Sequence, residues 1–353
     1  MHIKDLSYII VLFTLLSSSC SKSVPKVSLG CEENSVGNNI IKWEIIPRME
    51  GTVKIYASNS RYEFKKEDPV GLADINDQRI VIVNNDPTNR KFYKIVFGKD
   101  MEAVITSRNI NINNVKNFRD LGGYRIFSTD QGGKWGQIFR SGSLDNIDSC
   151  GLSRLKNLGV KTIVSLDPKS ANPELLKSNF NYISIPLYSK NFEKYFQQVY
   201  TGKLNREQVN SKLQNVYKHL VADFLPEYEQ VFNLLLDKKN YPIVFACAAG
   251  KEQTGIVSFL ILTSLGVDVQ TARLDYLRTN QFIDISEASK YATRLPISAQ
   301  EALTALMLAQ EDYIDAAINE MKQSYGSIEG YLTEGIGLSK NDLSKLRLML
   351  LEK

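Results

Sequence analysis

The sequence has few histidines and few cysteines, and this scarcity limits the chemistry open to it. Its 353 residues include two histidines, His2 and His219, and four cysteines, at positions 20, 31, 150 and 247. If the N-terminal segment that contains His2 is removed, a histidine-based zinc site or a Ser-His-Asp triad would depend on His219 alone. This argues against both kinds of site. The cysteines show neither a CxxC pair nor metal-ligand spacing, so neither a metal nor a cofactor is expected. A disulfide between Cys31 and Cys150 is an open alternative.

The chain also lacks a strong charge of either sign. Its formal net charge is +4, with 43% hydrophobic and 23% charged residues, which is an ordinary globular composition. No dense stripe of lysine and arginine with interleaved aromatic residues occurs, so no nucleic-acid partner is expected. The length favours about two domains.

The N-terminal residues predict a secretion signal. Leu6–Leu16 is an eleven-residue apolar stretch, too short for a bilayer core, which needs about 20 residues. It suits the apolar region of a signal peptide, although a soluble helix or a poor membrane anchor is the alternative. Leu-Ser-Ser-Ser-Cys at 16–20 resembles a bacterial lipoprotein box. The resemblance implies a lipoprotein signal peptide over 1–20 with lipid on Cys20, or plain secretion as the fallback.

Two further expectations follow from this lipoprotein reading. Residues 21–29 form a tether between the lipid and the folded protein. Ser21 after Cys20 gives no obvious signal for retention in the inner membrane. The expected location is therefore the cell envelope, in the outer membrane facing the periplasm.

Residues 30–107 predict a small all-β domain. Runs rich in β-branched and aromatic residues alternate with turn-rich stretches, and the expected strands are 40–46, 52–57, 79–83, 91–97 and 102–107. Their spacing indicates a sandwich, and Trp43 is a candidate core residue, as in fibronectin-like or immunoglobulin-like folds. This segment shows no catalytic cluster, so a spacer or a docking module for a protein partner is expected.

Residues 108–353 predict an α/β domain that follows a connector at 108–116. Three apolar runs are expected to form buried strands: Val160–Leu166, Tyr182–Leu187 and Tyr241–Cys247. Helices are expected at 206–221, 226–238, 254–265, 270–279, 299–309, 311–324 and 339–351. Such alternation indicates a parallel sheet flanked by helices.

The loop after the third of these strands carries the chemistry. Cys247 is followed by small residues, Gly250 and Lys251, and then by a helix that begins near Thr254. Backbone amides that converge in such a loop, together with the helix N-terminus, bind a phosphate-like dianion. The same environment lowers the pKa of a thiol, and a thiolate there can attack phosphorus. The alternative is that Cys247 is a small buried hydrophobic residue in an ordinary turn.

Four blocks in order resemble one family. Cys-x-x-Gly-Lys-x-x-Thr-Gly at 247–255 resembles the His-Cys-x-x-Gly-Lys-Asp-Arg-Thr-Gly loop of the bacterial and fungal tyrosine phosphatases, a family of lipid phosphatase-like dual-specificity type. The other blocks are Asn117–Tyr124, Ile138–Gly142 and 325–338. The resemblance implies a cysteine-phosphatase-like fold over 108–353. It also implies hydrolysis of phosphotyrosine or other phosphomonoesters through a phosphocysteine.

The chain departs from this pattern at the loop itself. Gln253 replaces the family arginine, Ala246 the histidine and Glu252 the aspartate, and Ser165-Leu166-Asp167 stands in place of Asp-Leu-Arg. An arginine grips two phosphate oxygens with charge-assisted bonds. Its loss is expected to cost roughly 10²–10⁴ in rate.

The resemblance assigns roles to individual residues. The catalytic set is Cys247, Glu252 as general acid, and Gln253, and the substrate-binding set is Ala248, Ala249, Gly250, Lys251, Thr254, Arg119 and Asp120. Arg119 and Arg140 either supply the missing positive charge or support the loop, Arg119 by pairing with Asp120 or Asp167. The region 190–232 is expected to form a lid or a core face, with aromatic residues at 192, 195, 196 and 200.

Three functions compete on this evidence from the sequence. The first is a phosphatase of the cell envelope acting on a phosphorylated protein or a small phosphomonoester. The second is a catalytically impaired pseudophosphatase that binds phosphorylated ligands or acts as a scaffold. The third is a surface interaction protein in which the β domain does the main work.

Overall fold

A computed structural model describes residues 25–65, 67–98, 101–168, 173–188, 191–283 and 292–352 of the chain. The predicted signal peptide, its lipidation site Cys20 and residues 21–24 of the tether lie outside these residues. Within the described part, none of the helices has both the length and the apolar character that crossing a membrane requires.

The N-terminal part, the β module (residues 26–106), consists of two antiparallel sheets. One sheet has the order β1-β2-β5 and the other β4-β3-β6-β7. The strands are β1 Lys26–Glu33, β2 Asn39–Ile46, β3 Thr52–Ser58, β4 Gly71–Asp74, β5 Arg79–Ile82, β6 Phe92–Phe97 and β7 Met101–Thr106. The five expected strands are present. β1 begins at Lys26, within the predicted tether, so the boundary at residue 30 was placed too late.

The side chains of both sheets share one hydrophobic cluster. It contains Trp43 of β2, Val53 of β3 and Tyr93 of β6, all fully or nearly fully buried. β2 alternates buried and exposed residues along its length, as a strand with one face on a core must. The Trp43 indole nitrogen donates a hydrogen bond to the Ile75 carbonyl, 2.7 Å away, which satisfies its polar atom inside the core.

The C-terminal part is built on a five-stranded sheet of order β13-β12-β14-β11-β8. Its strands are β8 Arg119–Asp120, β11 Ile138–Ser141, β12 Thr162–Ser165, β13 Asn181–Ser184 and β14 Ile243–Ala246. All neighbours pair in parallel except β8, which runs antiparallel to β11. β9 Arg125–Ile126, β10 Gln131–Gly133 and β15 Leu351–Glu352 form a small separate sheet. The predicted mixed α/β architecture with a parallel sheet is confirmed.

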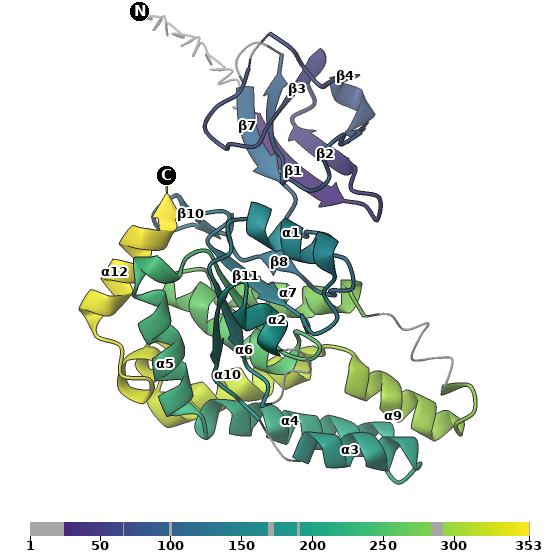
Figure 1. Cartoon of the computed structure of the whole chain (residues 1–353), viewed down its shortest axis with the longest axis vertical. Coiled ribbons are helices and arrows are strands. Elements are labelled where there is room, and N and C mark those ends of the chain that lie inside the picture. The colour runs from purple at the N-terminus through teal and green to yellow at the C-terminus, as the bar shows by residue number, and fades with distance from the viewer. Residues whose placement is uncertain are drawn as a thin grey trace, which may run out of the picture.

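The helices pack around this sheet and extend beyond it. They are α1 Ser149–Asn157, α2 Pro173–Lys177, α3 Asn191–Tyr200, α4 Arg206–Ala222, α5 Leu225–Leu235, α6 Glu252–Ser264, α7 Val269–Leu277, α9 Ile297–Met307, α10 Glu311–Tyr325, α11 Ile328–Gly330 and α12 Lys340–Leu350. The β module lies at one end of the molecule, and α3, α4 and α9 extend at the other (Figure 1).

The four aromatic residues expected on a lid or core face lie on α3. Tyr195 packs against the main core cluster, whereas Tyr200 is 36% exposed. The side chains of Phe192 and Phe196 lie outside the described part of the chain.

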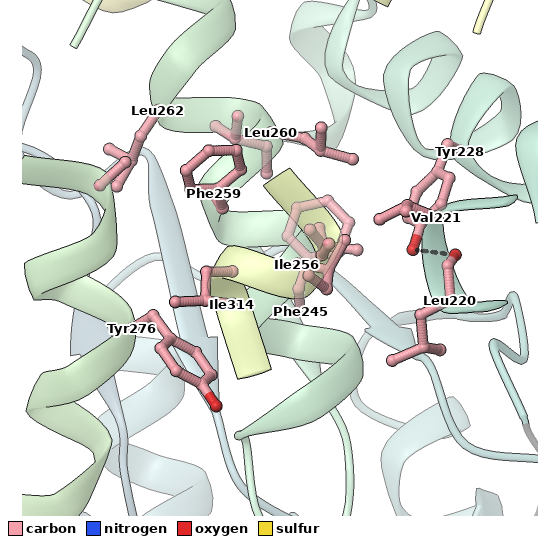
Figure 2. Packing of buried hydrophobic residues seen from close by; sticks show 14 of the residues in the cluster. Leu220, Val221, Tyr228, Phe245, Ile256, Phe259, Leu260, Leu262, Tyr276 and Ile314 are labelled. Carbon is pink, nitrogen blue, oxygen red and sulfur yellow. Dashed lines mark hydrogen bonds between the residues drawn. The ribbon is translucent and has the colours of Figure 1, made fainter. Parts of the chain in front are cut away.

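Helix α6 lies at the centre of the C-terminal core. Eleven of its thirteen residues are buried, and its apolar side chains point in all directions, which is the pattern of a helix surrounded by protein. Figure 2 shows Ile256, Phe259 and Leu260 of α6 packed among side chains from several neighbouring elements. A helix held on every side fixes the position of its own N-terminus, where the candidate phosphate loop ends.

Candidate active site

The strand–loop–helix unit predicted around Cys247 is present. β14 lies between β12 and β11 and ends at Ala246, immediately before Cys247, and α6 begins at Glu252. The loop 247–251 therefore spans the gap between a central buried strand and a central buried helix. Both of its ends are anchored in the core.

The backbone carbonyls of the loop are bound on its outer side. The Asn117 side-chain amide donates to the carbonyls of Ala249 and Gly250, at 3.1 and 2.9 Å. The Arg140 guanidinium donates to the Gly250 carbonyl at 2.6 Å. In a trans peptide the N–H points opposite to the C=O, so the Lys251 amide, in the same peptide unit as the Gly250 carbonyl, faces the inner side. The Gly250 amide instead donates to the Cys247 carbonyl, 3.3 Å away. The loop thus presents the Lys251 amide to an anion bound on its inner side.

Gly250 has the backbone conformation that this arrangement requires. Its φ is 65°, in the left-handed region that side chains rarely adopt. A Cβ there would lie 2.6 Å from the Ser141 carbonyl oxygen and 2.8 Å from the Asn117 side-chain nitrogen. Any other residue would separate the loop from the side chain that holds its carbonyls.

Arg119 and Arg140 support the loop from behind. Both side chains are fully buried, and both bind Asp275 of α7, with nitrogen–oxygen distances of 3.3 and 2.6 Å. Tyr124 donates a third hydrogen bond to the same carboxylate, at 2.8 Å. Burial opposes the charged form of Asp275, but the two arginines outweigh it and hold its pKa well below the usual range.

These contacts decide between the roles left open for the two arginines. They are tied to Asp275 and to the loop's outer side, so they do not supply the positive charge that Gln253 lacks. Arg119 pairs with Asp275 and not with Asp120 or Asp167. Asp275 was missed because it lies in no motif. The signal available was that arginines in two buried strands need a buried counter-charge.

The environment of the Cys247 thiol differs from expectation. The residue is 2% exposed, and its sulfur lies near the hydroxyl and the amide of Thr254. Burial, followed by the negative charge of Asp167, raises the pKa of the thiol to about 11, and the Thr254 contacts only partly offset this. The predicted lowering of the thiol pKa was wrong, because the loop amides and helix N-terminus do not outweigh burial beside two carboxylates, Asp167 and Glu252.

A hollow beside Cys247 is lined by acidic side chains. Asp145, Asp167 and Cys247 all face it, together with Ser165 and Tyr182. Burial raises the pKa of Asp167 to about 6, and the nearby Ala248 backbone amide opposes that rise. Asp167 stands where the resembling pattern has an arginine.

Lys251 and Glu252 form a buried pair at the start of α6. The Lys251 ammonium donates to the carbonyls of Leu306 and Met307 at the end of α9, at 2.6 and 3.0 Å, and lies 3.0 Å from the Glu252 carboxylate. A cation at a helix C-terminus is electrostatically favourable. In this structure Lys251 thus binds α9 and Glu252, while its predicted contact with phosphate stays a prediction.

Asp120 and Gln253, two further residues of the predicted site, do not contribute to it as expected. Asp120 does not line the loop: its carboxylate binds Arg90 of the β module and the amides of Gly122 and Gly136, at 2.7 and 2.6 Å. Its predicted contact with substrate is therefore corrected. Gln253 is half-buried in the first turn of α6 and brings no charge.

Comparison with known proteins identifies the family. A model of the tyrosine phosphatase family matches residues 110–352. The chain belongs to this family. Its members are cysteine-dependent phosphatases, and the chain is accordingly a phosphoric monoester hydrolase by family.

Individual relatives show the range of names within this similarity. A protein of Cupriavidus necator, named provisionally as a tyrosine-protein phosphatase, is 25% identical over 242 residues, covering 66% of this chain and 85% of that protein. The triple specificity protein phosphatase PtpB of Mycobacterium tuberculosis is 25% identical over 276 residues, covering 67% and 96%. Inositol diphosphatase DSP2 of Arabidopsis thaliana is 28% identical over 134 residues, covering 33% and 49%.

Proposed function

We propose that the chain hydrolyses phosphomonoesters through a phosphocysteine intermediate on Cys247. The observation that carries the proposal is the loop 247–251 between β14 and α6, whose Ala249 and Gly250 carbonyls are bound outward by Asn117 and Arg140, which turns the Lys251 amide inward. Such amides stabilise the charge that develops on the phosphoryl oxygens during transfer. Family membership supports the same chemistry.

The reaction has two steps. The Cys247 thiolate attacks phosphorus, the bond from phosphorus to the leaving oxygen breaks, and an acid protonates that oxygen. Water then attacks the phosphocysteine, which releases inorganic phosphate and restores the thiolate. Two carboxyl groups compete as the acid. Glu252 forms an ion pair with Lys251, at 3.0 Å. Asp167 has a pKa of about 6 and lines the hollow beside the sulfur, so it is better suited to donate the proton.

The deciding experiment measures phosphate release by the mature chain from p-nitrophenyl phosphate and from a phosphotyrosine peptide. The wild type is expected to turn over slowly, and Cys247→Ser to abolish turnover. Gln253→Arg serves as the positive variant, because it restores a bidentate cation. Turnover that survives in Cys247→Ser would contradict the assignment of the nucleophile.

A second function is favoured by the thiol itself. At neutral pH a thiol with a pKa of about 11 is ionised only about once in 10⁴ molecules. Gln253 also leaves the loop without the family's cation. The chain in that case is a pseudophosphatase that binds phosphorylated ligands or acts as a scaffold. Tungstate binding to a wild type without turnover, with turnover gained in Gln253→Arg, would support this function.

The proposed substrates are phosphotyrosine in a phosphorylated protein or another small phosphomonoester. The relatives named for tyrosine and triple specificity support the first, and the one named for inositol diphosphate supports the second. Initial rates with a phosphotyrosine peptide and with an inositol phosphate, compared as kcat/KM, distinguish them. Equal and very low values for both would count against each as the natural substrate.

We further propose that the protein is lipid-anchored in the cell envelope, in the outer membrane facing the periplasm. The apolar stretch and Cys20 at the end of residues 1–20 support this proposal. Labelled palmitate is expected to enter the wild type and not Cys20→Ala, and the variant is expected to leave the membrane fraction. We assign the β module to the fibronectin-like or immunoglobulin-like sandwiches, supported by its two sheets around Trp43, and expect it to dock a protein partner.

A further inference from the structure

The β module is joined to the C-terminal part by a buried ion pair. Arg90, just before β6, binds the carboxylate of Asp120 on β8, and the two side chains are 9% and 0% exposed. The other nitrogens of the guanidinium bind the Thr106 hydroxyl at the end of β7, at 3.0 Å, and the carbonyl of the next residue, Ser107, at 2.9 Å. The Arg90 guanidinium also lies over the ring of Trp135. The pair is therefore fixed on both sides.

Asp120 transmits this fixed position to β8. Its backbone amide donates to the Arg108 carbonyl at 3.0 Å, and Arg108 donates back to the Asp120 carbonyl at 2.7 Å. On its other edge β8 pairs with β11, Arg119 opposite Arg140 and Asp120 opposite Phe139. A strand of only two residues has little pairing of its own, so these neighbours determine where Arg119 lies.

Arg119 is adjacent to Asp120 in the sequence and is connected to the phosphate loop through Asn117. Its guanidinium binds the side-chain oxygen of Asn117. The amide of Asn117 holds the carbonyls of Ala249 and Gly250, at 3.1 and 2.9 Å. A continuous path thus runs from Arg90 to the phosphate loop, through the ion pair with Asp120, the backbone of β8 from Asp120 to Arg119, and the hydrogen bonds of Asn117.

We propose that Arg90 is a positioning residue for the phosphate loop, so that the β module is a structural part of the active site. Without Arg90, a fully buried Asp120 carboxylate loses its counter-charge, and water or a shift of β8 must compensate. Either response moves Arg119 and releases Asn117 from the geometry that orients the loop amides. The catalytic consequence rests on the proposed function, whereas the order of the loop does not.

The same interface offers a matched control. Glu33 of β1 binds Arg154 of α1 through both carboxylate oxygens, at 2.7 and 2.8 Å. This pair also joins the β module to the C-terminal part and is also largely buried. Arg154 lies on α1, and α1 carries none of the residues that bind the phosphate loop. Glu33→Gln therefore removes an ion pair of the interface and leaves every hydrogen bond and ion pair of the path through β8 in place, apart from the electrostatic attraction between Glu33 and Arg90.

The experiment uses the full mature chain and compares Arg90→Gln with Glu33→Gln. Hydrogen exchange of the amides at 248–251 is expected to be about tenfold faster in Arg90→Gln and to change less than about twofold in Glu33→Gln. The amides of α5 report whether the fold as a whole is retained. Arg90→Lys, which restores the charge, is expected to recover part of the protection. Where turnover is measurable, kcat is expected to fall in Arg90→Gln with KM little changed.

The double variant Arg90→Gln/Asp120→Asn covers the case in which Arg90→Gln does not fold. It removes the unpaired charge, and the proposal still expects a loosened loop because the link is absent. Loop exchange at the wild-type rate in a folded Arg90→Gln or double variant overturns the proposal, and so does equal loosening in Glu33→Gln. A loosened loop in a chain without turnover contradicts the proposed function and supports this inference. Wild-type turnover with an unaltered loop in Arg90→Gln supports the proposed function and contradicts this inference.

Discussion

Asp167 lies beside Cys247 and, after burial, is the largest influence that raises the pKa of its thiol, to about 11. A phosphate site ordinarily favours the thiolate by surrounding it with positive charge. Here the carboxylate lies where the resembling family pattern has arginine, and Gln253 stands in place of a second arginine. The two replacements act in the same direction, against a thiolate and against a bound dianion.

Asp167→Asn is expected to lower the pKa of Cys247, because it removes the negative charge next to the sulfur. Each pKa unit of lowering raises the thiolate fraction, and with it the alkylation rate at pH 8, about tenfold. The pH dependence of iodoacetamide alkylation, read at the Cys247 peptide, measures this shift. Asp145 lines the same hollow, and Asp145→Asn should lower the pKa of Cys247 less than Asp167→Asn does. An alkylation midpoint that does not move in Asp167→Asn would show that Asp167 does not control the thiol.

The same substitution tests which carboxyl group donates the proton. Loss of a general acid costs about 10²–10⁴ in rate for a poor leaving group and less for a good one. Asp167→Asn is therefore expected to slow phenyl phosphate hydrolysis far more than p-nitrophenyl phosphate hydrolysis. Glu252→Gln is the comparison, and a selective loss with phenyl phosphate in that variant instead would assign the acid to Glu252. In the wild type, the rate with phenyl phosphate should rise with pH up to about 6, the pKa of Asp167, and level off above it, because the loss of the Asp167 proton then offsets the growing thiolate fraction of Cys247.

Gln253→Arg is expected to raise kcat/KM for p-nitrophenyl phosphate by roughly 10²–10⁴, because a guanidinium binds two phosphoryl oxygens with charge-assisted bonds. Gln253→Lys supplies charge without the planar fork and should recover only part of the gain. The measurement is steady-state turnover of both variants beside the wild type. Equal rates in all three would mean that the position does not contact the transferred group.

Asp275→Asn is expected to cost about 3–5 kcal/mol in the free energy of unfolding, because it leaves Arg119 and Arg140 buried without their counter-charge. Denaturant unfolding measures the loss. Glu174→Gln, which breaks an exposed pair with Lys177, should cost less than about 0.5 kcal/mol. Because the pKa of Asp275 is lowered in the folded state, its stabilisation is present above the unfolded-state pKa and is lost as pH falls below it. The free energy of unfolding of the wild type should therefore fall more steeply in acid than that of Asp275→Asn. An equal decline in both would contradict the stabilising role of the Asp275 carboxylate.

Much of the fold follows from local sequence pattern. Buried strands such as Ile243–Ala246 are short apolar runs between turn residues, and α4 occupies 206–222 where 206–221 was expected. β1 was missed although Val27, Leu29 and Cys31 alternate along it and pack against the cluster of the β module, because its first residues were assigned to the predicted tether. β4, with four residues, is too short to show a period.

The site could be predicted only as far as its motif reaches. Cys247, Gly250 and Thr254 lie adjacent in the sequence, so their spacing predicts the loop. Asp275 is 156 residues from Arg119, and no local pattern connects them. The effect of Asp167 on the thiol likewise arises from the neighbouring ends of β12 and β14, which only the folded sheet brings together.

The most direct test of the account is to find the phosphate on the enzyme. Acid quenching during turnover of p-nitrophenyl phosphate, followed by peptide mass spectrometry, locates any covalent phosphate. The account predicts a phosphorylated peptide containing Cys247, absent from Cys247→Ser, and more abundant in Gln253→Arg. Sustained turnover with no phosphate on Cys247, and with the same rate in Cys247→Ser, would contradict it.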